Sequence, residues 1–229
     1  MTARTTAPAT APAPFGGDFS GDFEAHVTVR APGPSEVAAL ERYAAARGVK
    51  FAHIVLDRGR TPSQPMLTLR ASGELPGVRA AVEGAVREVR DAGFEVVRAK
   101  VEAAPWAAGV PESDEAAVAL GARYYFEHHI KLLLPPGTDV AALAELASGH
   151  CAHLSRNARR VRADGRAERF VTQRCRMVGR RTAGARLDAL TAAIGAAGYE
   201  MASAEREFVV YDSDASLDAG WISEEGTGE

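Results

Sequence analysis

Two histidines in this sequence stand in nearly the same local setting, far apart in the chain. His26 follows Phe-Glu-Ala and His129 follows Phe-Glu-His, so that Glu24 and Glu127 each precede a histidine by two residues. Because the ordinary pKa of histidine lies close to neutral pH, two histidines in one site can donate and accept a proton. A glutamate two residues away on the same strand face can orient each ring. His26, His129, Glu24 and Glu127 are therefore the predicted catalytic residues.

Hydroxyl, cationic and further histidine side chains also recur. Thr-Leu-Arg at 68–70 matches Thr-Gln-Arg at 172–174, and Ala-His at 52–53 matches Ala-His at 152–153. A guanidinium group binds phosphate and carboxylate oxygens through paired hydrogen bonds, which favours an anionic substrate. The predicted substrate-binding residues are His53, His153, Thr68, Arg70, Thr172, Arg174, Lys131 and Glu207.

The segment His26-Val27-Thr28-Val29 resembles one half of the H-x-T pair of two-lobed 2H phosphoesterases. In that family two histidines act as general acid and base, and the hydroxyls hold the phosphate. The likeness covers four residues. The equivalent segment reads His129-Ile130-Lys131-Leu132, with lysine in place of the hydroxyl, and His153-Leu154-Ser155 has the pattern on a different strand. The resemblance implies phosphoester cleavage or transfer as a chemical analogy.

The matched segments follow one another in the same order, at offsets of 100 to 105 residues, which indicates an internal repeat. Each copy shows the order strand, helix, strand, strand, helix, strand, which is typical of the ferredoxin-like arrangement. The predicted fold class is therefore α+β, a tandem duplication of a ferredoxin-like βαββαβ unit. It has two antiparallel sheets, with helices on one face of each.

Composition changes along the chain define its organisation. The predicted parts are a disordered Ala/Pro/Thr leader (1–20), a first ferredoxin-like repeat (21–103), a linker (104–122), a second repeat (123–211) and an acidic C-terminal tail (212–229). Within that tail, Trp221 and Ile222 could dock back onto the body. No run of apolar residues is long enough to span a membrane, and two cysteines make no disulfide framework, so a cytoplasmic location is expected.

Strand alternation assigns the polar residues to one face of each sheet. In the first strand Ala25, Val27 and Val29 should contact the helices, which leaves Glu24 and His26 on the open face. In the second strand Ala52, Ile54 and Leu56 are expected on the helix side, which places His53 on the open face. The fourth strand would add Lys100 and Glu102. If the two sheets face each other about 10 Å apart, the polar faces enclose a cleft.

These patterns predict an enzyme that acts on a small phosphorylated or carboxylated molecule in a His/Glu/Arg-lined cleft between the repeats. One alternative is a non-catalytic RNA- or nucleotide-binding module. The net charge is −3, yet residues 156–181 contain ten arginines and two acidic residues. A second alternative is an enzyme in which His and Glu residues bind a divalent metal, since both residue types bind Zn²⁺ or Fe²⁺. Solvated sheet faces are the plainest interpretation. The sequence leaves the cofactor, the substrate and the oligomeric state open.

Overall fold

The structure is a computed structural model that describes residues 17–158 and 163–222. Its first half contains β1 (Ser20–Arg30), α1 (Pro34–Arg47), β2 (Lys50–Leu56), β3 (Ser63–Glu74), α2 (Leu75–Asp91) and β4 (Glu95–Ala103). Its second half contains β5 (Tyr125–Leu134), α4 (Val140–Ser148), β6 (Ala152–Asn157), β7 (Ala167–Arg176), α5 (Arg180–Ala196) and β8 (Glu200–Asp212). The predicted mixture of helices and antiparallel strands is confirmed, and each half has the predicted order of elements.

The eight strands form one closed antiparallel barrel in the order β1-β3-β2-β6-β7-β5-β8-β4. The two halves join edge to edge, because β2 pairs with β6 and β4 pairs with β8. The sequence predicted two separate antiparallel sheets, and this expectation is wrong, because the strands of both halves belong to one barrel. Each half alone would leave two edge strands with unpaired backbone groups, and closure pairs them.

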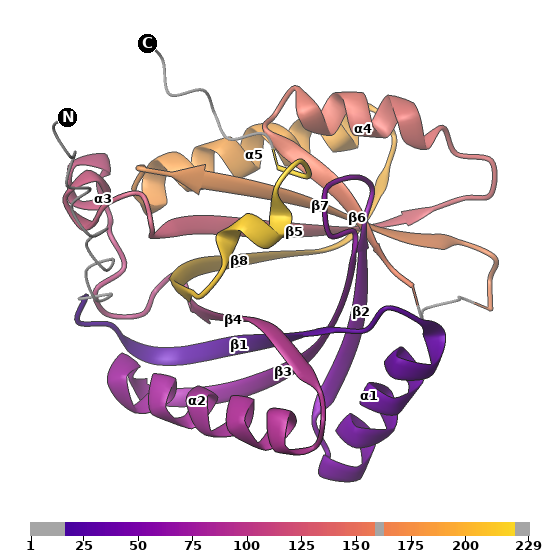
Figure 1. The fold of residues 1–229 in the computed structure, drawn as a ribbon. Coiled ribbons are helices and arrows are strands. Elements are labelled where there is room, and N and C mark those ends of the chain that lie inside the picture. Colours follow the sequence, from indigo (N-terminus) through magenta and orange to yellow (C-terminus); the bar gives the residue numbers. More distant parts are fainter. Residues whose placement is uncertain (1–16, 159–162, 223–229) are drawn as a thin grey trace, which may run out of the picture.

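The helices lie on the outside of the barrel, with α1 and α2 over the first half and α4 and α5 over the second (Figure 1). Helix α1 shows how the sequence directs this packing. It begins at Pro34 and ends before Gly48, whose φ of 65° closes the last turn in the left-handed region. Val37, Leu40 and Ala44 form its buried face, spaced three and four residues apart.

Two segments outside the repeats are structured. The segment expected as a linker contains α3 (Asp114–Leu120), and Asp114 accepts hydrogen bonds from the backbone N–H of Gly179 and the hydroxyl of Thr182. The described part of the expected tail, residues 212–222, contains the 3₁₀ turn η1 (Ala215–Asp218) and packs on the barrel. Residues 1–16 and 223–229 of the expected leader and tail lie outside the described residues. Within residues 17–158 and 163–222, no helix combines the length and the apolar character that crossing a membrane requires.

Candidate functional site

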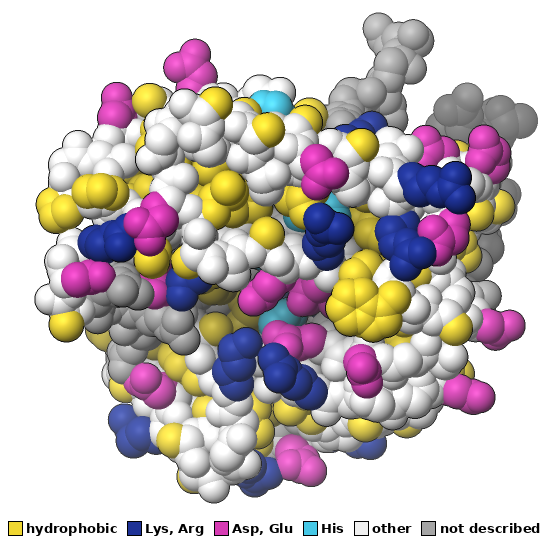
Figure 2. Space-filling model, turned by 180° about the vertical axis from the view of Figure 1, so that it is seen from behind, with side chains coloured by type: hydrophobic (Ala, Val, Ile, Leu, Met, Phe, Trp, Pro, Cys, Tyr) yellow, Lys and Arg dark blue, Asp and Glu magenta, His cyan; other side chains and the backbone are white. Residues whose placement is uncertain are grey.

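The barrel interior holds a polar cavity of about 270 Å³ to which all eight strands contribute side chains. Alternation produces it, because on most strands the apolar residues face the helices and the intervening polar residues face inward; β2 is the exception. A hollow of about 640 Å³ adjoins one end and shares Glu24, Lys50, Glu205 and Glu207 with the cavity. We call this end the mouth. Figure 2 shows one face of the molecule with a hollow in which a histidine and acidic side chains are visible, with basic side chains at its rim.

Each half contributes a histidine that is held at both ring nitrogens. The Nδ1 atom of His26 lies 3.1 Å from Thr68 Oγ1, and its Nε2 atom lies 3.0 Å from a Glu102 oxygen. The Nδ1 atom of His129 lies 3.0 Å from Thr172 Oγ1. Both threonines stand directly opposite their histidines in the strand register. The two halves thus present the same His–Thr arrangement to one cavity.

The glutamates before the two histidines contact the ring at Nε2, and they do so at different distances. Glu127 approaches Nε2 of His129 at 3.2 Å, and Glu24 lies 3.8 Å from Nε2 of His26. The threonines occupy Nδ1, so they fix the ring orientation. The glutamates contact the nitrogen that faces the cavity, where they stabilise positive charge on the ring.

Neighbouring histidines on β5 have opposite acid–base character. Burial disfavours the charged ring of His129, but its hydrogen bonds and ion pairs with Glu127 and Glu207 outweigh burial and raise its pKa to about 10. His128 points to the opposite face of the strand, and burial lowers its pKa to about 4 despite its hydrogen bond to the Ala183 carbonyl. His129 is therefore an imidazolium at neutral pH, while His128 is neutral.

A network of buried ion pairs connects the two halves. Lys100 Nζ lies 2.6 Å from a Glu102 oxygen and 2.7 Å from Glu127 Oε1. Glu127 also accepts from Nε of Arg174. Burial opposes ionisation of Glu127, but Arg174 and Lys100 outweigh it and hold its pKa well below the ordinary value. These cations and carboxylates therefore stay charged inside the barrel.

Most of the predicted site residues lie together in this cavity. Those that line it are Glu24, His26, Thr68, Glu127, His129, Lys131, Thr172, Arg174 and Glu207. Lys131 is paired with Glu168 at 3.0 Å. Arg70 lies in the mouth rather than in the cavity, where it donates from Nε to Glu24 at 3.0 Å.

The prediction for His53 is wrong, because β2 has the opposite orientation to the one expected. Ala52, Ile54 and Leu56 line the cavity, while Phe51 packs on the outer core and His53 hydrogen-bonds Ser63 at 2.9 Å. Both faces of this strand carry apolar residues, so alternation alone did not distinguish them. Its matched partner His153 is not among the residues that line the cavity. Its Nδ1 atom accepts a hydrogen bond from Arg58, and its ring lies near Trp221, which does line the cavity.

Sequence reasoning missed Arg98 and Asp218, which also line the cavity. Arg98 precedes Lys100 and Glu102 at alternate positions of β4, so the strand pattern could have indicated it. Asp218 lies beyond the last strand, where periodicity gives no signal for an inward-facing carboxylate.

No protein-family model and no curated protein matches the chain. Among solved structures, it is similar to the ligand-free regulatory subunit of aspartate kinase from Thermus thermophilus. That match has 14% identity and a TM-score of 0.31, and covers 77% of this chain and 96% of that one. The chain is also similar to a chlorite dismutase-like protein, with 11% identity, a TM-score of 0.25, and 89% and 100% coverage. At these TM-scores neither likeness contributes to the inferences below.

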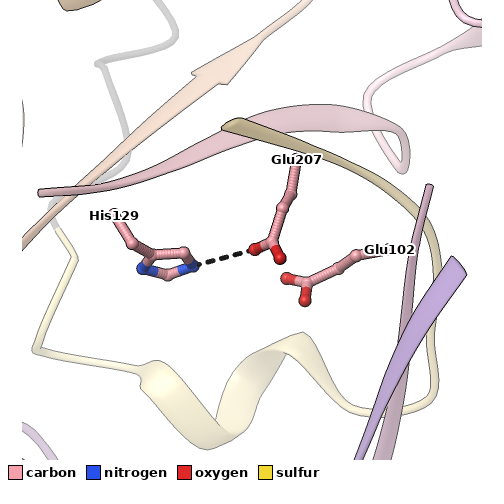
Figure 3. Close-up of side chains that lie close together, drawn as sticks. All are labelled: Glu102, His129 and Glu207. Atoms are coloured by element: carbon pink, nitrogen blue, oxygen red, sulfur yellow. Dashed lines mark ion pairs between the residues drawn. The ribbon is translucent and has the colours of Figure 1, made fainter. Parts of the chain in front are cut away.

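Three side chains from neighbouring strands could hold a metal ion. Three candidate ligand atoms lie within 4.8 Å of one another (Figure 3), one each from Glu102 on β4, His129 on β5 and Glu207 on β8. Carboxylate oxygens and an imidazole nitrogen are suitable ligands for divalent transition metals. An incoming metal would have to compete with Lys100 for Glu102 and with the proton on His129.

We expect both ring nitrogens of His129 to remain protonated throughout the neutral range, with a titration midpoint near pH 10. Histidine ¹⁵N chemical shifts followed against pH would measure this. Glu207→Gln should lower the pKa of His129, because it removes a carboxylate 3.3 Å from Nε2. Thr172→Val leaves both carboxylates in place and should change the pKa less. A midpoint near the ordinary histidine value in the wild type would contradict the charged assignment.

Proposed function

We propose that the barrel cavity is the active site of an enzyme that acts on a small phosphorylated or carboxylated molecule. The observation that carries the proposal is the pair of His–Thr units facing one cavity, His26 with Thr68 and His129 with Thr172. Paired histidines held at Nδ1, with Nε2 toward a cavity, suit general acid–base catalysis. The repeated local sequences support the further proposal that the two halves arose by duplication.

The two histidines would have different roles. His129 carries a proton on Nε2 at neutral pH, so it would act as the general acid or stabilise negative charge that develops on the substrate. His26 would act as the base, since its Nε2 atom faces Glu102, whose carboxylate stabilises the ring after it accepts a proton. Phosphoester cleavage or transfer is the reaction class that this arrangement suits best.

Basic side chains at the mouth support an anionic substrate. Lys50 and Arg70 are largely exposed and both contact Glu24, so they can reorient toward an incoming anion at little cost. Deeper in, the His129 imidazolium and the Lys100 ammonium lie beside the cavity. A substrate that enters here therefore meets exposed cations first and the histidines next.

Ligand binding tests the substrate class. We expect small phosphorylated and carboxylated compounds to raise the thermal stability of the wild-type protein, and their uncharged parent compounds to leave it unchanged. If none of the anions stabilises a folded wild-type protein, the anionic substrate is excluded.

Catalysis is tested with p-nitrophenyl phosphate and bis(p-nitrophenyl) phosphate. His129→Ala should lower turnover by about 100-fold or more, the usual contribution of a general acid or base, and His26→Ala should do the same. His53→Ala is the matched control, because His53 lies on the same barrel but points outward. Wild-type rates in both cavity variants would exclude the proposed roles.

A divalent-metal enzyme is a second candidate, favoured by the convergence of Glu102, His129 and Glu207. Titration of the protein with Zn²⁺ and Mn²⁺ by calorimetry tests it. Glu102→Ala and Glu207→Ala should each abolish the strongest binding event, and His150→Ala should control for surface coordination beside Cys151. If the wild type and the three variants bind the metal equally well, the metal site lies outside the cavity.

Three of the seven described arginines in the 156–181 segment are held in ion pairs within the chain, which makes them less available to RNA. Arg166 is paired with Glu200, Arg174 with Glu127 and Asp218, and Arg180 with Glu112. Arg159, Arg160 and Arg162 lie outside the described residues. A fluorescence titration with short RNA at two salt concentrations would test this alternative, because phosphate contacts make affinity fall steeply with salt.

A further inference from the structure

We infer that Arg98, Arg174 and Gln64 form an anion-binding subsite of the cavity, and that Asp218 occupies it as an internal stand-in for the anionic group of a ligand. This inference rests on the proposed function in taking the ligand to be a small anion. The subsite would bind a carboxylate or phosphate group.

The contacts of Asp218 resemble those of a bound anion. Its Oδ2 atom accepts from Arg98 Nη1 at 2.9 Å and from Arg174 Nη2 at 2.6 Å, and its Oδ1 atom accepts from Gln64 Nε2 at 2.9 Å. The three donors come from β4, β7 and β3, in both halves of the barrel. Two guanidinium groups and an amide that converge on one carboxylate are a common arrangement for carboxylate and phosphate recognition.

The two ends of the barrel differ in how far they are covered. Glu24 faces Arg70 across β1 and β3, and Glu127 faces Arg174 at the matching position of β5 and β7. The Arg70 side chain is 79% exposed at the mouth, whereas the Arg174 side chain is 6% exposed. Asp218 and Trp221 contact Arg174 and contribute to its burial. The end of the barrel at Arg174, which corresponds in the repeat to the mouth at Arg70, is therefore closed by residues 213–222. We call these residues the C-terminal cover.

Besides the Asp218 ion pairs, hydrogen bonds and the buried Trp221 side chain hold the C-terminal cover. At its start, the Ser213 N–H donates to the Ala99 carbonyl at 3.0 Å, and Ser213 Oγ accepts from the Ala99 N–H at 2.9 Å. The Trp221 indole donates to the Leu154 carbonyl at 2.8 Å, and the Arg60 N–H donates to the Ala219 carbonyl at 2.9 Å. Arg58 Nε donates to the Trp221 carbonyl at 3.3 Å. Beyond Ser213 the cover adds no strand to the barrel, so residues 214–222 can leave without breaking strand pairing. A ligand anion that replaced the Asp218 carboxylate would restore the buried charge balance and release the cover.

Removal of the Asp218 carboxylate tests the subsite, with inorganic phosphate and acetate as probes. We expect full-length Asp218→Ala to bind phosphate at least tenfold more tightly than the wild type, measured by calorimetry, because no internal carboxylate competes. Asp214→Ala is the matched control, since Asp214 lies in the same segment and bonds Ser216 rather than the arginines. If Asp218→Ala does not fold, Asp218→Asn retains the size and removes the charge. Equal phosphate affinity in wild type and the folded variant would overturn the inference.

Release of the cover is tested by fluorescence in a Trp106→Phe background, because the chain has two tryptophans and Trp106 is 74% exposed. Saturating phosphate should shift the emission of Trp221 to longer wavelength as the indole leaves its buried position. Binding of phosphate without this shift would overturn displacement of the cover. If Asp218→Ala binds phosphate tightly but no substrate assay detects turnover, the subsite is supported and the enzymatic proposal is contradicted.

Discussion

Arg174→Met is expected to lower the free energy of unfolding by about 3–5 kcal/mol, the usual cost of removing one partner from a buried ion pair. Glu127 and Asp218 both accept from Arg174 and are almost fully buried, so the substitution leaves two carboxylates without a main counter-ion. Burial opposes their ionisation, and the positive charge of Arg174 holds the pKa of each below its ordinary value. Urea unfolding monitored by circular dichroism would measure the loss.

The barrel supplies its own control for this prediction. Arg70 occupies the matching position, pairs with the matching Glu24, and is exposed. Arg70→Met should therefore cost less than about 1 kcal/mol, as is usual for exposed ion pairs. In addition, Asp218→Asn combined with Arg174→Met should recover part of the loss, because one unpaired carboxylate is removed. Similar losses in the two single variants would show that burial does not set the energy of this pair.

The sequence predicted the elements and most of the cavity lining, because alternation and the repeated segments depend on local information. His26, Thr68, His129 and Thr172 lie together as expected, since each pair is fixed by strand register within one half. How the halves join was not predicted. It depends on the pairing of strand edges far apart in the chain, which periodicity within each copy does not reveal.

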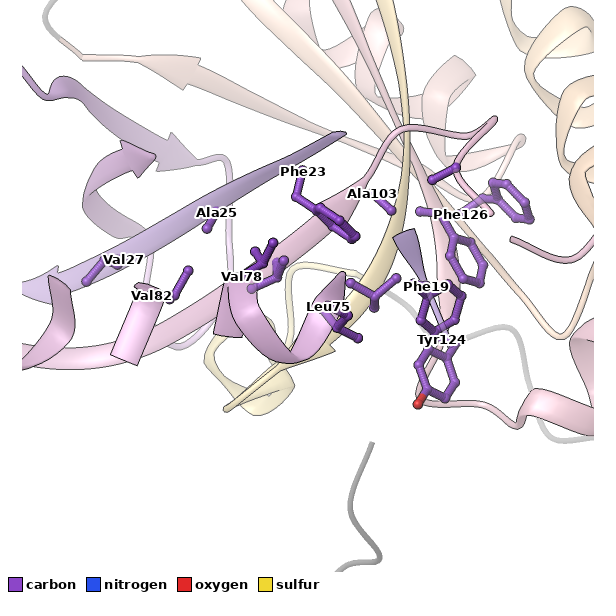
Figure 4. Packing of buried hydrophobic residues seen from close by; sticks show 14 of the residues in the cluster. Phe19, Phe23, Ala25, Val27, Leu75, Val78, Val82, Ala103, Tyr124 and Phe126 are labelled. Carbon is purple, nitrogen blue, oxygen red and sulfur yellow. The ribbon is translucent and has the colours of Figure 1, made fainter. Parts of the chain in front are cut away.

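The segments outside the repeats were the other failure. Phe19 was assigned to a disordered leader by composition, yet it is buried and packs near Tyr124, Phe126 and Phe208 (Figure 4). The tail assignment failed similarly, because an acidic composition gave no sign that Asp218 would meet two arginines. A charged residue in a polar segment becomes part of a site only through tertiary contacts, and these have no local pattern.

Two buried neutral histidines are expected to make the protein unstable in mild acid. Burial lowers the pKa of His128 to about 4, and burial together with the charges of Arg58 and Arg174 lowers the pKa of His153 to about 4. Each ring is ordinarily protonated near pH 6.5 in the unfolded chain. The unfolded state therefore binds more protons as the pH falls from 6.5 toward 4, and stability decreases over that window, by up to about 3 kcal/mol for His128 and by less for His153.

The environments of the two rings explain why neither tolerates a proton. His128 Nε2 donates to the Ala183 carbonyl. Its Nδ1 atom is buried, and no acceptor among the described residues would bind a proton added there. His153 Nδ1 accepts from Arg58, so protonation would place two cations in contact. Urea unfolding at half-unit steps from pH 7 to pH 4.5 would measure the loss, and substitution of each histidine would separate its share from that of the carboxylates. His128→Gln and His153→Gln should each reduce the slope of the unfolding free energy against pH, and the double variant should reduce it most. If the unfolding free energy of the wild type does not change from pH 6.5 to pH 4.5, the two rings are not held neutral.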